Sequence, residues 1–484
     1  MIEALKPTVV WNYFYELTQI PRITGHTLAV ASYVERFGKN LGLETLRDEI
    51  GNILIRKPAT KGMENCKPVI LQSHLDMVPQ KNASTVHDFF TDPIKPRIDG
   101  DWVTASGTTL GADNGIGVAM AMSVLSSKTI EHGPVEALFT IDEEVGMVGA
   151  FNIEETFLRG WILINLDSEE EGQLFAGCAG GQDISVSFDY NDIDVNPKDR
   201  LAFRIDLTGL KGGHSGVDIH LGRANANKLM FHFLHEAFFI HDAQLCAING
   251  GSLRNAIPRE ATAIITIKKE KEKELRDLVE DFQQAFRTEY AGIETNISFS
   301  IKNVAHPPTI IPPTIVSRII LAIEGCQNGV ISMLHDFPDT VESSSNMASI
   351  ISRPGNTEVR FLIRSASERK KSWVYNSIES IFTLAEAAVD NENAYSGWQP
   401  NIQSPILNLM KRTYETLYGK TPAVKVIHAG LECGIIQGIY PDMDMVSIGP
   451  DLQYPHSPDE RVNIASVEKT WNYLTETLKQ IKNI

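Results

Sequence analysis

The chain has 484 residues, of which 43% are hydrophobic and 22% are charged, an ordinary globular composition. Its 61 acidic and 44 basic residues give a net charge of -17, which excludes a nucleic-acid surface because phosphate binding needs a basic stripe. The same charge disfavours an anionic membrane as a partner. At about 150 residues per domain the length predicts about three domains, and two large ones fit as well.

The first residues and the cysteines indicate a compartment. Residues 1–20 lack the basic start, apolar core and small-residue cleavage site of a signal peptide. No stretch approaches the roughly 18 apolar residues of a membrane span. The five cysteines include no C-x-x-C pair, which is typical of reduced thiols. We therefore expect a cytoplasmic protein with no membrane partner.

Helix and strand patterns alternate along the first third of the chain. Apolar residues at helical spacing predict helices over 8–19, 27–41 and 116–125. Short apolar runs predict strands over 52–56, 69–73, 135–141 and 161–166. Strands separated by helices predict an α/β layer with a largely parallel sheet.

The pattern changes from about residue 184, where longer strands with alternating polarity begin. A charged segment over 269–289 predicts a helix with a solvated face. The proline-rich segment 306–314 predicts a connector, because Pro-Pro pairs suit neither a helix nor a central strand. A further strand, EVRFLIRS, and a helix over 371–389 complete this part.

Helix and strand patterns alternate again in the last part of the chain. It predicts a helix over 405–418, a strand VKVIH, a loop AGLECG, a strand MDMVSIG and a helix over 466–481. We therefore predict a discontinuous α/β domain that is interrupted by an α+β domain. The predicted boundaries are 1–183 and 395–484 for the first domain and 184–394 for the inserted one.

His74 and Asp76 form an H-x-D triplet directly after the predicted strand 69–73. Residues two apart on an extended segment face the same way, so both should project from the carboxyl edge of the sheet. A carboxylate beside an imidazole fixes the tautomer of a metal-ligating histidine. Taken alone, however, such a triplet is more often a turn histidine with a capping aspartate.

Asp113 lies on the glycine-rich loop 111–117. This loop is not a dinucleotide-binding fingerprint, because Met120 stands where the third glycine is required. By itself Asp113 is best interpreted as the N-cap of a helix.

Three adjacent acids, Asp142, Glu143 and Glu144, end another predicted strand. They repel one another unless a cation or a shared proton offsets the cost, although a surface loop would also explain them. Two more strands are followed by Asp167 and by His456.

The five potential ligands are more informative together than separately: His74, Asp113, Glu144, Asp167 and His456. Two imidazoles and three carboxylates, one of them shared, are sufficient for two metal ions about 3.5–4 Å apart. Mixed nitrogen and oxygen ligands without thiolate favour Zn²⁺, with Co²⁺ or Mn²⁺ as alternatives. Glu143 would then be free to take a proton from water and pass it to a leaving amine.

The chain resembles the aminoacyl-histidine dipeptidases, also called β-alanyl-histidine or Xaa-His dipeptidases. They belong to the co-catalytic dizinc peptidase superfamily, with carnosinases, tripeptidase T and aminoacylases. The resemblance runs nearly end to end, through GNILIRKPATKGMEN, LQSHLDMVPQKN, GTTLGADNGIG, LINLDSEEEG, GCAGG, LKGGHSG, GGSLRNAIPREA, GWQP, IHAGLECG, DMDMVSIGP and PHSPDE. It implies a discontinuous dizinc-peptidase catalytic domain with an inserted α+β lid domain.

The resemblance also implies a role for each ligand. His74 and Asp167 would bind one metal ion, and Glu144 and His456 the second. Asp113 would bridge both ions, and in this family a cis peptide bond often follows it.

Two further acids have roles in the family. Asp76 would orient the imidazole of His74, and Glu143 would be the general base.

Three residues of the inserted domain and one of the tail would bind the substrate. His214 would polarise the scissile carbonyl, Asn255 would hydrogen-bond the peptide, and Gly430 would offer a backbone contact. Arg364 would bind the terminal carboxylate, with Arg360 as a competitor on the same strand. Without the resemblance His214 reads as a surface residue of a turn.

The resulting prediction is metal-dependent hydrolysis of small peptides. The expected substrates are dipeptides, preferentially Xaa-His and including β-alanyl-histidine (carnosine), cleaved by metal-activated water with lid closure. A tripeptidase or N-acyl amino acid deacylase of the same superfamily is the alternative, followed by a non-catalytic metal- or peptide-binding relative. The resemblance suggests a homodimer, although a monomer would also work if the long insertion supplies the histidine that shorter relatives take from a partner. We interpret His428 as structural and Cys433 as a packed thiol.

Overall fold

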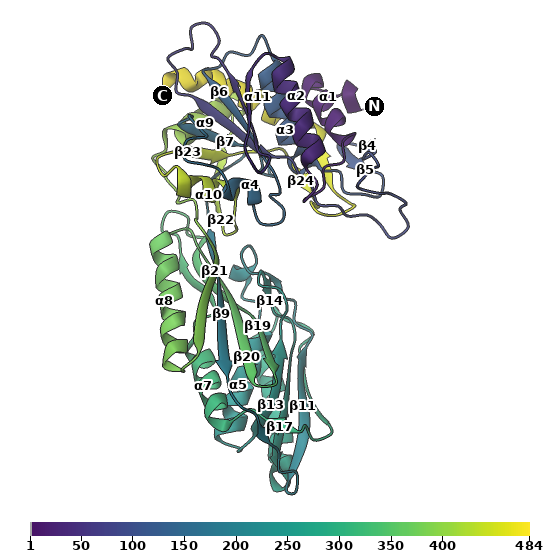
Figure 1. Cartoon of the computed structure of the whole chain (residues 1–484), viewed down its shortest axis with the longest axis vertical. Helices are drawn as coiled ribbons and strands as arrows, with labels where there is room; N and C mark the ends of the chain where they lie inside the picture. The colour runs from purple at the N-terminus through teal and green to yellow at the C-terminus, as the bar shows by residue number, and fades with distance from the viewer. Residues whose placement is uncertain (1) are drawn as a thin grey trace. The chain divides into compact units, whose positions relative to one another are not determined.

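The computed structural model describes residues 2–484, which form two compact units (Figure 1). Unit 1 contains the residues up to Cys178, together with Trp398–Val426 and Leu431–Ile484. Unit 2 contains Ala179–Gly397 and Ile427–Gly430. The sequence did not predict that a short piece of the tail, Ile427–Gly430, packs with the inserted segment.

Unit 1 is built on an eight-stranded sheet with the order β1-β2-β6-β3-β7-β23-β8-β22. The strands are β1 (Glu44–Arg47), β2 (Ile53–Lys57), β3 (Val69–His74), β6 (Val135–Thr140), β7 (Ile162–Asn165), β8 (Gln173–Cys178), β22 (Ala423–Ile427) and β23 (Asp444–Ser447). The central pairs β6–β3, β3–β7 and β7–β23 are parallel. The pairs β1–β2, β2–β6 and β23–β8 are antiparallel, so the prediction of a largely parallel sheet is right only for the centre.

The helices of unit 1 are α1 (Thr8–Thr18), α2 (Leu28–Asn40), α3 (Ala112–Ser126), α4 (Val148–Phe151), α9 (Pro405–Tyr418), α10 (Glu432–Ile439) and α11 (Ile464–Gln480). Helix α3 is buried on nearly every side, which its small residues permit. Helix α10 lies where the sequence predicted a loop. A second sheet, β24-β25-β5-β4, contains β4 (Pro96–Asp99), β5 (Trp102–Ala105), β24 (Leu452–Gln453) and β25 (Arg461–Asn463).

Unit 2 is built on a nine-stranded antiparallel sheet with the order β16-β11-β15-β13-β19-β20-β9-β21, in which β18 pairs with β19. Its strands are β9 (Gly180–Asp189), β11 (Arg200–Thr208), β13 (Gln244–Gly250), β15 (Ala261–Lys268), β16 (Ser298–Asn303), β18 (Gly329–Met333), β19 (Val341–Arg353), β20 (Asn356–Ser365) and β21 (Ala388–Tyr395). Two short ribbons pair β10 (Ile193–Asp194) with β17 (Thr309–Ile310) and β12 (Gly213–His214) with β14 (Ala256–Ile257).

Four helices pack against this sheet: α5 (Ala226–Phe239), α6 (Glu272–Glu289), α7 (Pro313–Gly325) and α8 (Glu368–Leu384). Two predictions here are wrong. The second Pro-Pro pair opens α7, because a proline in the first turn lacks only an N–H that has no partner in the helix anyway. Helix α8 ends at Leu384, before the predicted end, and strand β21 follows.

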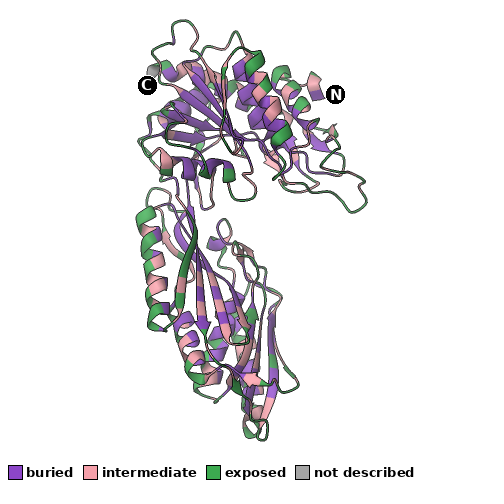
Figure 2. Cartoon of the chain, in the orientation of Figure 1, coloured by how far each residue is buried: buried purple, intermediate pink, exposed green. Residues whose placement is uncertain are grey.

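Each unit has its own hydrophobic core, and buried residues follow the strands of both sheets (Figure 2). Phe139 of β6 is completely buried in the core of unit 1, and Phe361 of β20 is 1% exposed in the core of unit 2. Among the described residues, no helix combines the length and the apolar composition needed to cross a bilayer.

The separate cores predict that a core truncation weakens only its own unit. Phe139→Ala should lower the stability of unit 1, and Phe361→Ala that of unit 2, by about 3–5 kcal/mol each. Hydrogen-exchange mass spectrometry should show faster amide exchange in β3 and β6 for the first variant and in β9 and β20 for the second. Equal loss of protection in both sheets after either change would contradict two separate cores.

Candidate functional site

The predicted ligands meet because the strands that carry them are neighbours in the sheet. Strands β6, β3, β7 and β23 are adjacent, and the first three are parallel, so their carboxyl ends lie at one edge. His74 is the last residue of β3, Glu144 follows β6 and Asp167 follows β7. Asp113 opens α3 in a non-helical conformation, and a cis peptide bond joins it to Asn114.

The two carboxylate oxygens of Asp113 face two different imidazoles. Its Oδ1 lies 3.0 Å from His74 Nε2, and its Oδ2 lies 3.2 Å from His456 Nε2. His74 Nε2 is also 3.3 Å from Asp167 Oδ1, and His456 Nε2 is 3.0 Å from Glu144 Oε2. The result is two three-residue groups that share Asp113, each with its ligand atoms within 4.8 Å of one another.

The donor atoms of these groups fit a divalent cation. Imidazole nitrogens and carboxylate oxygens, without thiolate, are typical ligands of such ions at catalytic sites. Glu144 Oε1 and Asp167 Oδ1 are buried, and neither accepts a hydrogen bond of good geometry in the part of the chain that the structure describes, although Asp167 Oδ1 lies 3.3 Å from His74 Nε2. Buried carboxylate oxygens without partners are costly, and coordination would satisfy them.

Two of the carboxyl groups, those of Glu143 and Asp167, have a raised pKa in this environment. Burial raises the pKa of Glu143 well above its usual range; His74 opposes the shift and Asp167 adds to it. Burial likewise raises the pKa of Asp167 to about 6, against the attraction of His74. A dication bound among these groups would offset their repulsion and displace protons.

Asp76 does more than face the imidazole of His74, from which its Oδ1 is 3.4 Å distant. Its carboxylate also accepts hydrogen bonds from the backbone N–H of Glu143 (3.0 Å) and of Glu144 (3.2 Å). The hydroxyl of Thr24 donates a further bond of 2.9 Å. Asp76 therefore holds the backbone of the two glutamates in place, a contact that the H-x-D spacing did not predict.

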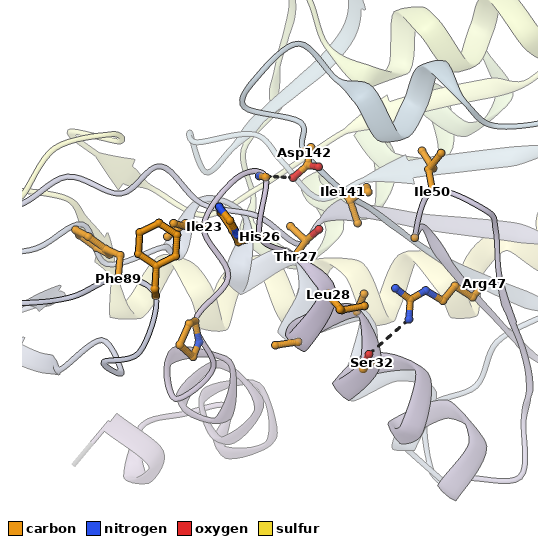
Figure 3. A pocket seen from close by; sticks show the side chains of 16 residues that line it. Ile23, His26, Thr27, Leu28, Ser32, Arg47, Ile50, Phe89, Ile141 and Asp142 are labelled. Carbon is orange, nitrogen blue, oxygen red and sulfur yellow. Dashed lines mark hydrogen bonds between the residues drawn. The ribbon is translucent and has the colours of Figure 1, made fainter.

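The turn before α2 also contacts the loop that carries Glu143 and Glu144. The backbone N–H of Gly25 donates a 2.7 Å hydrogen bond to Asp142 Oδ1, at the edge of a cavity of about 810 Å³ (Figure 3). Figure 3 shows His26, Leu28 and Ile50 lining this cavity. The sequence did not predict this contact, because it joins segments 117 residues apart.

In unit 2, the position of the proton on His214 can be assigned from its partners. Its Nδ1 accepts hydrogen bonds from the backbone N–H of Gly216 (3.1 Å) and Val217 (3.2 Å), so the proton of the neutral ring is on Nε2. Burial and then the charge of Arg364 lower the pKa of His214. The ring is therefore a neutral hydrogen-bond donor through Nε2.

Two side chains and one backbone carbonyl of unit 2 meet at Gly216. A Cβ atom on Gly216 would lie 3.0 Å from the His214 ring and 3.2 Å from Arg364 Nε, and it would overlap the carbonyl oxygen of His428. Arg364 is 5% exposed and bonds Tyr395 Oη through Nη1, but its Nε has no hydrogen-bond partner among the described residues. A buried guanidinium with a free N–H is a receptor for an anionic group.

The other two predicted residues of unit 2, Asn255 and Gly430, belong to segments that adjoin this cluster. Asn255 is exposed, and its carbonyl accepts a 2.8 Å bond from Ser215, next to His214. Gly430 belongs to the tail segment whose carbonyls at Ile427 and Ala429 accept the N–H of Ala179.

Two buried acids of unit 1 were not given a role from the sequence. Glu432, in AGLECG, accepts hydrogen bonds from Gln72 and Thr140. Glu460, in PHSPDE, accepts bonds from the loop of Asp113. Both lie in motifs that carry the family resemblance, but the sequence alone does not show which acid of a motif is buried.

Residues 70–480 match Peptidase family M20/M25/M40, most of the chain. The chain belongs to this peptidase family.

Several relatives of known identity cover the whole chain. It is 46% identical to the cytosol non-specific dipeptidase of Escherichia coli (strain K12), over 99% of both chains. The structure of aminoacylhistidine dipeptidase from Vibrio alginolyticus matches with a TM-score of 0.93 and 45% identity, covering 99% of this chain and 98% of that one. Aminopeptidase PepT from Bacillus cereus, with a TM-score of 0.58 and 16% identity over 99% of both chains, shares the fold.

For this M20/M25/M40 peptidase, the burial of His428 predicts a pH-dependent stability of unit 2. Burial and then the charge of Arg364 lower the pKa of His428 to about 3, and its Nε2 lies 2.7 Å from Ser344 Oγ. Because this value is below the unfolded pKa of about 6.5, the unfolded state takes up the proton first. The contribution of His428 to the free energy of unfolding is therefore fully present above pH 6.5 and is lost as the pH falls toward 3.

The measurement is the difference in unfolding free energy of unit 2 between pH 7 and pH 5. It should be about 2 kcal/mol smaller in His428→Asn than in the wild type. The exposed His335→Asn is the control and should behave as the wild type does. Equal pH dependence in the wild type and His428→Asn would refute the role of His428.

Proposed function

We propose that the chain hydrolyses dipeptides, preferentially Xaa-His dipeptides including carnosine, at a centre of two divalent cations. The observation that carries the proposal is that Asp113 directs one carboxylate oxygen to His74 and the other to His456. The two full-length relatives, a non-specific dipeptidase and an aminoacylhistidine dipeptidase, support the substrate class. Zn²⁺ is our first assignment, with Co²⁺ or Mn²⁺ as alternatives.

Each ion would have its own ligands and share Asp113. His74 and Asp167 would hold the first ion, and Glu144 and His456 the second. When bound, such ions supply Lewis acidity to the scissile carbonyl and lower the pKa of the attacking water.

Glu143 is the proton carrier in this proposal. Its carboxylate would take a proton from the attacking water and deliver it to the nitrogen of the leaving amine. Its backbone is held by Asp76, so its side chain starts from a fixed position. Glu143 could form a metal-binding group with His74 and Glu144, but it is not a member of either group that contains Asp113.

The residues of unit 2 would bind the peptide. The Nε2–H of His214 would donate to the carbonyl oxygen as negative charge develops on it. Arg364 would receive the terminal carboxylate, with Asn255 and the backbone of Gly430 as further contacts. Recognition of a free carboxylate restricts cleavage to a peptide bond near the carboxyl end of the substrate.

The test is a substrate panel with metal-depleted and reloaded protein. Chelation should abolish hydrolysis, and Zn²⁺, Co²⁺ or Mn²⁺ should restore it, with the highest kcat/KM on Xaa-His dipeptides. Glu143→Gln should lower kcat by about 10²- to 10⁴-fold at unchanged metal content, because only proton transfer is removed.

Other outcomes would assign other activities. Cleavage of tripeptides or N-acetyl amino acids without action on dipeptides would assign one of the related activities instead. Metal-loaded protein that hydrolyses none of these substrates would exclude an enzyme of this kind.

Arg364 and Arg360 form a matched pair on β20. Arg364→Gln should raise KM for dipeptides about 10- to 100-fold, because charge-assisted hydrogen bonds to the carboxylate are lost. It should also abolish the preference for a free carboxylate over a C-terminal amide. Arg360 is 38% exposed and bonds Glu358, so Arg360→Gln should leave KM unchanged. A larger effect of Arg360→Gln would reassign the carboxylate site.

A further inference from the structure

The loop that carries Asp113 is bound by one buried carboxylate. Glu460 is 2% exposed, and its Oε2 accepts the backbone N–H of Leu110 (2.7 Å) and Gly111 (2.9 Å). Its Oε1 accepts the N–H of Ala112 (2.7 Å) and of Asp113 itself (3.3 Å). Four consecutive N–H groups therefore end on one side chain.

A buried cation holds the carbonyl side of the same loop. Arg22 is 2% exposed, and its Nη2 donates to the carbonyl of Gly111. Its Nη1 donates to the carbonyls of Leu75 (2.9 Å) and Asp76 (3.1 Å), in the loop after β3. Arg22 thus ties the loop of Asp113 to the segment that follows His74.

The loop has little room to adjust. Gly111 has a φ of 72°, in the left-handed region that favours glycine. A Cβ atom there would lie 2.6 Å from Arg22 Nη2 and 2.8 Å from Met77 Sδ. The backbone and the guanidinium are therefore in close contact.

Glu460 also belongs to the segment that delivers His456. The N–H of Glu460 donates a 3.0 Å bond to the carbonyl of Ser457, closing a turn directly after His456. One short segment therefore supplies an imidazole on one side of Asp113 and an anchor for the Asp113 backbone on the other. The distance between His456 and Asp113 therefore depends on the conformation of this segment.

We propose that Glu460 and Arg22 are positioning residues for the metal centre. They hold the loop of Asp113 between them, Glu460 at its N–H groups and Arg22 at the carbonyl of Gly111, so that the two oxygens of Asp113 stay directed at His74 and His456. The proposal rests on the proposed function, because it assumes that these groups bind metal. Both oxygens of Glu460 are needed as acceptors, since an amide in its place would turn an NH₂ group toward two of the four N–H donors.

The test measures metal binding, with Co²⁺ as the probe, in Glu460→Gln and Arg22→Lys. Loss of a residue that orients a ligand typically costs 10- to 100-fold in metal affinity. Each variant should bind Co²⁺ at least about tenfold more weakly than the wild type in competition with a chelator. The visible absorption of bound Co²⁺ should also change, because the ligand geometry changes.

Glu136→Gln is the matched control. Glu136 is 3% exposed and likewise accepts two backbone N–H groups, those of Arg159 (2.8 Å) and Gly160 (3.0 Å). It lies near the start of β6, away from the carboxyl edge of the strands. Glu136→Gln should lower the melting temperature without changing the Co²⁺ affinity or spectrum.

Three results would overturn the proposal or its basis. If both test variants bind Co²⁺ with wild-type affinity and spectrum, the two residues serve stability alone. If neither variant folds although Glu136→Gln does, their role is in the fold and not confined to the metal centre. If the wild type itself binds no Co²⁺, the proposed function fails instead, which distinguishes the two failures.

Discussion

Four acidic side chains lie together at the carboxyl edge of the central strands: Asp113, Glu143, Glu144 and Asp167. Two unit charges 4 Å apart at a protein surface interact by about 4 kcal/mol, several times the net value of an ordinary hydrogen bond. Burial is the main cause of the raised pKa values of Glu143 and Asp167, and neighbouring carboxylates add to both shifts against the attraction of His74. A divalent cation bound among these groups would offset the repulsion between the carboxylates.

The supporting groups of this site come from segments far apart in the chain. Asp76 binds the backbone of the two glutamates, Glu460 binds the loop of Asp113, and Arg22 binds the same loop from the other side. Arg22 and Thr24 precede residue 70, where the match to the family begins. Residues outside the matched region therefore hold the site that the matched region supplies.

Most elements of unit 1 could be predicted because their burial leaves a clear pattern. Apolar runs identified β3, β6 and β7, which are buried at every position. Strand β21 was missed because its residues are mostly exposed, so it has no alternation of polar and apolar side chains. Helix α10 was missed because its glycines resemble a loop, whereas Glu432 and Cys433 at its start are buried by tertiary packing.

The sequence by itself determined the chemical types of the candidate ligands and their order after the strands, because a strand ends where its apolar run ends. It also determined the family, through motifs spread over nearly the whole chain. Only the tertiary structure decided which oxygen of Asp113 faces which imidazole and that Glu460, 347 residues away, anchors it. Such contacts depend on how distant segments pack, and no local pattern of polarity or spacing records that packing.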